Sequence, residues 1–126
     1  MRYQGSVAAA AFALLSSGAA HAATEANFNA QTAADLVALC SATPDNGLGT
    51  AALNFCEGYL QGAVTVEMQD QTAFRGRKLF CLPNPPPTRS QAMSEFVGWV
   101  QAAPDCPTLP ATDGLFRFLS ERYPCP

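Results

Sequence analysis

The sequence predicts an all-α fold, a small disulfide-braced bundle of four main helices. Four stretches place apolar residues at spacings of three and four, the periodicity of a helix with one buried face. No stretch alternates apolar and polar residues as a half-buried strand does. Five cysteines in a short chain are typical of a disulfide framework. Together these patterns favour helices joined by short loops over a sheet-based fold.

The first 22 residues have the organisation of a secretory signal peptide. Arg2 supplies a positive charge, residues 7–15 form an almost unbroken apolar run, and Ala20-His21-Ala22 has small residues at both recognition positions. A transmembrane anchor needs about 20 apolar residues, and this run is much shorter. We expect cleavage after Ala22 and export to the periplasm. The mature chain, residues 23–126, then has the size of a single domain.

Charge and histidine content exclude several functions. The formal net charge is −3, and loss of Arg2 with the signal peptide makes it more negative. Nucleic-acid binding requires a basic footprint and is therefore not expected. The only histidine, His21, lies in the signal peptide. The mature chain would thus lack the commonest general base and metal ligand.

The first two helices are expected on either side of a turn. Residues 23–30 are small and polar, and we expect a loose arm. Thr32 and Asp35 have the spacing of a capping box at the start of the first helix, and residues 44–47, Pro-Asp-Asn-Gly, end it. The apolar stripe of this helix is Ala33, Leu36, Val37 and Cys40. The second helix is expected from about Thr50 to Gln69, with Leu53, Cys56, Leu60, Ala63 and Val64 on its inner face and a polar loop from Asp70 to Lys78 after it.

The last two helices follow proline-rich connectors. The stretch LFCLPNPPPT, residues 79–88, cannot be helical because proline lacks the amide donor. Thr88 or Ser90 can cap the third helix, which Pro104 ends. Pro110 suits the first turn of the fourth helix, expected from about Ala111 to Tyr123. The inward residues are Met93, Phe96, Val97 and Val100 in the third helix, and Leu115, Phe118, Leu119 and Arg122 in the fourth.

Gly58 and Gly62 stand four residues apart inside the second helix. Each glycine costs about 1 kcal/mol relative to alanine in a helix interior. Glycines at this spacing let another backbone approach closely. Two interpretations are open: tight packing inside the bundle, which we favour, and the seam of a homodimer.

No catalytic arrangement is recognisable in the mature chain. Its serines lie outside any G-x-S-x-G motif, and no glycine-rich phosphate-binding loop is present. Glu67 and Asp70 form the best-spaced carboxylate pair, but such pairs are more often a solvated face. The cysteines lack the short C-x-x-C spacing of zinc sites. We expect no enzyme activity, no cofactor and no metal.

Four short motifs follow one another along the mature chain: DLVALC at 35–40, FCEGYLQG at 55–62, LFCLP at 79–83 and YPCP at 123–126. In this order they resemble the Rap/Tai family of immunity proteins. The resemblance covers about Thr32 to Pro126, and two regions depart from it: the NPPP run and the PDCP that contains Cys106. The matching residues are structural, namely Cys40, Cys56, Gly58, Tyr59, Gly62, Cys81 and Cys125.

The resemblance implies a periplasmic, all-helical protein of a type VI secretion system. Such proteins bind peptidoglycan-cleaving amidase toxins delivered by kin. The motifs identify no residue that contacts the toxin. A second hypothesis, from another class, is a periplasmic acid-stress chaperone, or more generally a periplasmic protein-binding module. A chaperone of that kind exposes apolar surface on acidification, whereas an inhibitor binds one toxin at neutral pH.

Two disulfides are expected, and one cysteine is left over. Spacing alone does not choose among the possible pairings. An antiparallel hairpin of the first two helices would bring Cys40 to Cys56, and Cys81 could then tether the tail at Cys125. Cys106 would be free. Its neighbour Asp105 and the adjacent prolines do not favour a reactive, low-pKa thiol.

The stretch Gln69–Lys78 is the expected contact surface if the protein is an inhibitor. Phe74 could act as an apolar anchor, and Arg75, Arg77 and Lys78 could steer the encounter with an acidic cleft rim. The alternative is an ordinary solvated loop in which Phe74 folds back onto the core.

Overall fold

The structure is a computed structural model that describes residues 22–74 and 76–126, and the side chain of Phe74 is outside this description. The predicted fold class is confirmed: over these residues the chain has four α-helices, two disulfides and a single isolated β-bridge, between Thr32 and Pro110. None of these helices is both long and apolar enough to cross a membrane. The elements are η1 (Glu25–Asn29), α1 (Ala33–Cys40), α2 (Gly47–Phe74), α3 (Arg89–Ala102), η2 (Cys106–Thr108) and α4 (Ala111–Arg122).

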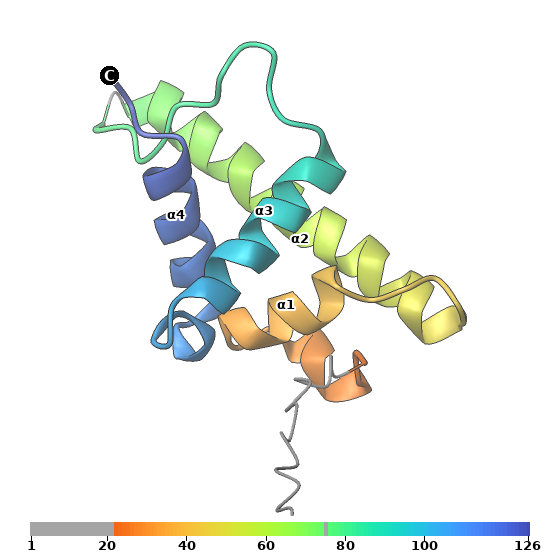
Figure 1. Cartoon of the computed structure of the whole chain (residues 1–126). Coiled ribbons are helices and arrows are strands. Elements are labelled where there is room, and N and C mark those ends of the chain that lie inside the picture. Colours follow the sequence, from red (N-terminus) through yellow and green to blue (C-terminus); the bar gives the residue numbers. More distant parts are fainter. Residues whose placement is uncertain (1–21, 75) are drawn as a thin grey trace, which may run out of the picture.

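The short helix α1 lies at the centre of the fold and contacts each of the other three (Figure 1). Leu36 and Leu39 of α1 are completely buried there. Helix α2 runs diagonally past the others, and its last turns reach the end of the molecule where the C-terminus lies. Residues that are less than 2 % exposed come from every part of this core: Leu36, Leu39, Cys56, Phe80, Phe96, Val100, Cys106, Leu115 and Phe118.

Reciprocal capping starts two of the helices. At α1 the Thr32 hydroxyl accepts the Asp35 amide at 3.2 Å, and the Asp35 carboxylate accepts the Thr32 amide at 3.0 Å. Thr88 and Gln91 make the same pair of bonds at the start of α3, at 3.2 and 3.0 Å. Each arrangement satisfies amide donors that have no partner inside the helix. The predicted starts of α1 and α3 are confirmed.

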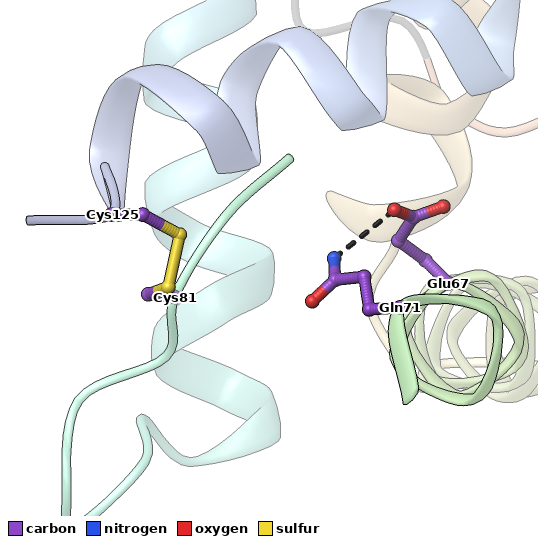
Figure 2. The surroundings of a disulfide bond; sticks show 4 residues. All are labelled: Glu67, Gln71, Cys81 and Cys125. Atoms are coloured by element: carbon purple, nitrogen blue, oxygen red, sulfur yellow. Dashed lines mark hydrogen bonds between the residues drawn. A yellow bond between two sulfur atoms is a disulfide. The ribbon is translucent and has the colours of Figure 1, made fainter. Parts of the chain in front are cut away.

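Helix α2 is longer than predicted at both ends. It starts at Gly47 because the Asn46 side chain accepts the Gly49 amide at 2.9 Å, so the turn residue also caps the helix. It ends at Phe74 and not near Gln69, so most of the expected polar loop is helical. Nothing between residues 69 and 74 breaks a helix, and Gln71 donates to Glu67 one turn earlier at 3.0 Å (Figure 2).

The N-terminal arm is ordered, and its prediction as a loose arm was wrong. Thr24 donates its amide to the Asn27 side chain at 2.8 Å, which caps η1. Asn27 in turn donates to the Asp35 carboxylate at 2.9 Å. The Phe28 ring packs edge-on against Phe55 of α2, with centroids 5.4 Å apart. A segment of small polar residues is therefore held by one aromatic contact and a short chain of hydrogen bonds.

The interpretation of Gly58 and Gly62 as internal packing positions was also wrong. Both are exposed, and a methyl group built on either would meet no atom within 4 Å. The close approach of two helices occurs at Gly114 of α4, where a Cβ would lie 2.9 Å from the Cβ of Ala33 in α1. Tyr59, between the two glycines, ties α2 to α4 because its hydroxyl lies 2.8 Å from that of Thr112.

The disulfides are the two expected pairs. Cys40 at the end of α1 is bonded to Cys56 in α2, with Cα atoms 5.2 Å apart. Cys81 in the connector after α2 is bonded to Cys125 beyond α4, with Cα atoms 4.9 Å apart (Figure 2). Cys106 is free and buried. The first bridge closes the α1–α2 hairpin, and the second attaches the C-terminal segment to the connector.

Candidate partner-binding surface

The predicted contact residues lie at and just after the end of α2. Arg75 and the side chain of Phe74 fall outside the described residues, so their placement in a contact surface stays a prediction. Arg77 and Lys78 are exposed. They are followed by Leu79, which is 46 % exposed, and by Phe80, which is 2 % exposed. The buried side chain of Phe80 therefore fixes the chain two residues after Lys78.

Arg77 and Lys78 differ from the other described cations because those cations form ion pairs with carboxylates. Arg89 pairs with Glu57 at 3.7 Å, and Arg117 pairs with both Asp105 and Glu121. Arg122 pairs with Glu95 at 2.8 Å. Arg77 and Lys78 form no ion pair with any described residue. Their charge is thus available to an external partner.

Two large apolar side chains in the second half of α2 are exposed. Val66 and Met68 are 59 % and 48 % exposed, the largest values among the exposed large apolar residues of the described chain. They stand two positions apart, so they lie on different sides of the helix and do not form one apolar patch. Val66 follows Gly58 and Gly62 at the same four-residue spacing, so these three share one helix face. Neither Val66 nor Met68 belongs to the inner face that the sequence predicts for this helix, and their exposure agrees with that prediction.

Glu95 connects α3 to the end of α4 in a charged cluster. It accepts two hydrogen bonds from Arg122, at 2.8 and 3.2 Å, and one from the Tyr123 hydroxyl at 2.8 Å. The bonds from Arg122, and then from Tyr123, hold the pKa of Glu95 below its usual value of 4.5. A carboxylate with a lowered pKa stabilises the fold above its unfolded pKa, and this contribution is lost as the pH falls through the lowered value.

The free thiol of Cys106 lies in surroundings that suppress its reactivity. It is 1 % exposed. Burial raises the pKa of Cys106, and the carboxylate of Asp105 raises it further. Because the thiolate is the nucleophile, this environment does not favour redox or covalent chemistry.

A hollow of about 150 Å³ lies between α2, α3, α4 and the proline-rich connector. Its walls include Leu60, Val64, Met93 and Phe118, and the exposed ion pair of Glu57 and Arg89 also lines it. Side chains of this type suit an apolar group.

The exposed glycines of α2 give a test of the packing. Gly58→Ala and Gly62→Ala should each raise the free energy of unfolding, by up to about 1 kcal/mol, because alanine is favoured in a helix interior and no atom obstructs its methyl group. Gly114→Ala is the matched control and should lower it, because its methyl group would meet Ala33. Urea denaturation measures the free energy of unfolding of all three variants. A loss of stability in the first two variants would contradict the open helix face.

The sequence matches the family of Rap1a immunity proteins over residues 32–125. No curated protein and no solved structure matches it. The matched span runs from the residue that caps α1 to the second cysteine of the Cys81–Cys125 bridge. It contains α1 to α4, both disulfides, Arg77 and Lys78. The resemblance noted from the four motifs is confirmed. Since the match covers most of the chain, the protein belongs to the family of Rap1a immunity proteins.

Proposed function

We propose that the protein is a periplasmic immunity protein that binds and inhibits a peptidoglycan-cleaving amidase delivered by type VI secretion. The family match over residues 32–125 carries this proposal, since membership implies immunity to a type VI effector. It also favours immunity over the acid-stress chaperone. The signal peptide over residues 1–22 and the two disulfides support an oxidising, extracytoplasmic location.

The proposed mode of action is steric occlusion by a rigid binder. Two disulfides and a buried core hold the bundle in one conformation, so little conformational entropy is lost on binding. Phe74, Arg75, Arg77 and Lys78 are the proposed contacts. Unpaired cations at Arg77 and Lys78 speed the encounter with an acidic cleft rim, an effect that salt weakens.

A homodimer is the second part of the proposal. The face of α2 that contains Gly58, Gly62 and Val66 is exposed, and no part of the described chain packs on the two glycines. Two such faces could approach closely because glycine removes the side chains between the backbones. Sedimentation velocity at two protein concentrations measures the association, and a purely monomeric protein would exclude it.

The decisive experiment combines export with inhibition. The full chain is expressed with its signal peptide and purified from the periplasm, and we expect N-terminal sequencing to start at Ala23. An amidase effector encoded beside it in the genome is then assayed on peptidoglycan. Equimolar protein should abolish hydrolysis by this amidase and leave lysozyme, the control hydrolase, unaffected. Unchanged amidase activity at equimolar protein would refute the proposed target.

A further inference from the structure

We propose that the hollow between residues 77–79 and the C-terminal segment is a docking site for an acidic, partly apolar segment of the protein partner. This C-terminal hollow has a volume of about 710 Å³ and is lined by Arg77, Lys78, Leu79, Ser120 and the segment 124–126. The inference depends on the proposed function in one respect, that the partner is a protein. The inference adds Ser120 and residues 124–126 to the proposed contact surface. The sequence did not indicate these residues, because they lie more than 40 positions from Arg77.

The two walls of the C-terminal hollow are fixed to each other. The Cys81–Cys125 disulfide joins them directly (Figure 2), and the Cys81 amide donates to the Tyr123 carbonyl at 2.8 Å. Phe80 and Tyr123, on either side of this junction, are 2 % and 8 % exposed. The hollow is thus formed before any ligand arrives, and binding does not require the ordering of its walls.

The charge of the C-terminal hollow selects an anionic ligand. Arg77 and Lys78 form no ion pair with the described residues, whereas Arg89, Arg117 and Arg122 are each neutralised by carboxylates. Pro126 also lines the hollow. A positive excess is left at this place on a chain whose net charge is −3. An acidic partner is therefore repelled elsewhere and attracted here.

The remaining lining residues indicate that the ligand is a peptide segment with apolar side chains. Leu79 is 46 % exposed, and Pro124 is also exposed. Apolar contact surrounded by charge is the usual composition of a protein–protein contact. A nucleic acid or an anionic membrane offers a more uniformly charged surface, which the overall negative charge of the chain repels.

The test uses a defined probe and does not need the effector. The ¹⁵N-labelled protein purified from the periplasm is titrated with the peptide acetyl-Asp-Leu-Glu-Leu-Asp-amide, and separately with the isosteric control acetyl-Asn-Leu-Gln-Leu-Asn-amide. The acidic peptide should shift the amide resonances of Lys78, Leu79, Ser120 and Cys125 more than those of the rest of the chain. The control peptide should not. No shift at millimolar peptide, or equal shifts with both peptides, would overturn the inference.

Two charge variants locate the site. Arg77→Gln combined with Lys78→Gln should weaken binding of the acidic peptide about fivefold to tenfold, because two exposed charges are removed. Arg89→Gln, which removes a paired charge elsewhere, should leave it unchanged. An equal loss in both proteins would show general charge attraction and contradict the site. Vesicles containing phosphatidylglycerol that bind through Arg77 and Lys78, when the peptide does not bind, would assign this surface to membranes and refute the proposal.

The outcomes separate this inference from the proposed function. If the amidase is inhibited but the peptide does not bind at the C-terminal hollow, this docking site is refuted and the immunity function stands. If the peptide binds there and the amidase is not inhibited, the docking site stands and the amidase target is refuted.

Discussion

Phe118→Ala is expected to lower the free energy of unfolding by about 3–5 kcal/mol, the usual range when a buried aromatic residue is truncated. Phe118 is 1 % exposed. Its ring lies 5.6 Å from that of Phe96, 6.0 Å from that of Trp99 and 6.3 Å from that of Tyr123, measured between centroids. One side chain therefore joins α3, α4 and the start of the C-terminal segment, and its removal leaves a cavity that these rings cannot fill.

Phe116→Ala is the matched control for this experiment. It removes the same side chain from the same helix, but Phe116 is only partly buried at the edge of the core. Urea denaturation of both variants should give a clearly smaller loss for Phe116→Ala. Equal losses would contradict the position of Phe118 in the centre of the core.

The parts of the fold that local sequence determines could be predicted. The starts of α1 and α3 follow from Thr32 and Thr88, because a cap and its partner three residues later form a self-contained arrangement. The C-terminal end of the third helix and the non-helical conformation of the connector follow from proline, which cannot continue a helix. These signals depend on a few neighbouring residues, so no knowledge of the tertiary structure was needed.

The errors occurred where distant contacts decide the structure. The arm at residues 23–30 is ordered by the contact of Phe28 with Phe55 and by the bond of Asn27 to Asp35. The exposure of Gly58 and Gly62, and the close contact of Gly114 with Ala33, depend on which face of each helix is turned to its neighbours. Neither fact is encoded in local spacing. The end of α2 differs from the prediction for another reason. The residues from Asp70 onward are mostly polar, which suggests a loop, but none of those up to residue 74 breaks a helix.

The candidate surface was predictable only in part. Arg77 and Lys78 stand out in the sequence as cations in a predicted polar loop. That they form no ion pair with a described residue depends on where the carboxylates of Glu57, Glu95 and Asp105 lie. The opposite wall of the C-terminal hollow depends on the bond between Cys81 and Cys125. That pairing was expected as a tether of the C-terminal tail, yet the cavity it creates could not be derived from the pairing alone.

Cys81→Ala combined with Cys125→Ala is the second change with a large expected effect. The bridge closes a loop with a sequence separation of 44, compared with 16 for Cys40–Cys56. Loop-closure entropy gives a stabilisation of about 4 kcal/mol for the longer loop and about 3 kcal/mol for the shorter one. Urea denaturation without reductant should therefore show the larger loss for the Cys81/Cys125 variant, and a larger loss for the Cys40/Cys56 variant would contradict the loop-closure argument.

The two disulfide variants differ more sharply in binding than in stability. Cys40 and Cys56 are buried between α1 and α2, so their loss weakens the core but leaves the C-terminal segment attached. Loss of the Cys81–Cys125 bridge removes the only covalent link between the walls of the C-terminal hollow. The backbone hydrogen bond from Cys81 to Tyr123 and the buried side chains of Phe80 and Tyr123 then hold the walls together. The Cys81/Cys125 variant should therefore bind the acidic peptide more weakly than the Cys40/Cys56 variant at a temperature where near-ultraviolet circular dichroism shows both folded. Unchanged peptide affinity would mean that the bridge stabilises the fold without shaping the binding surface.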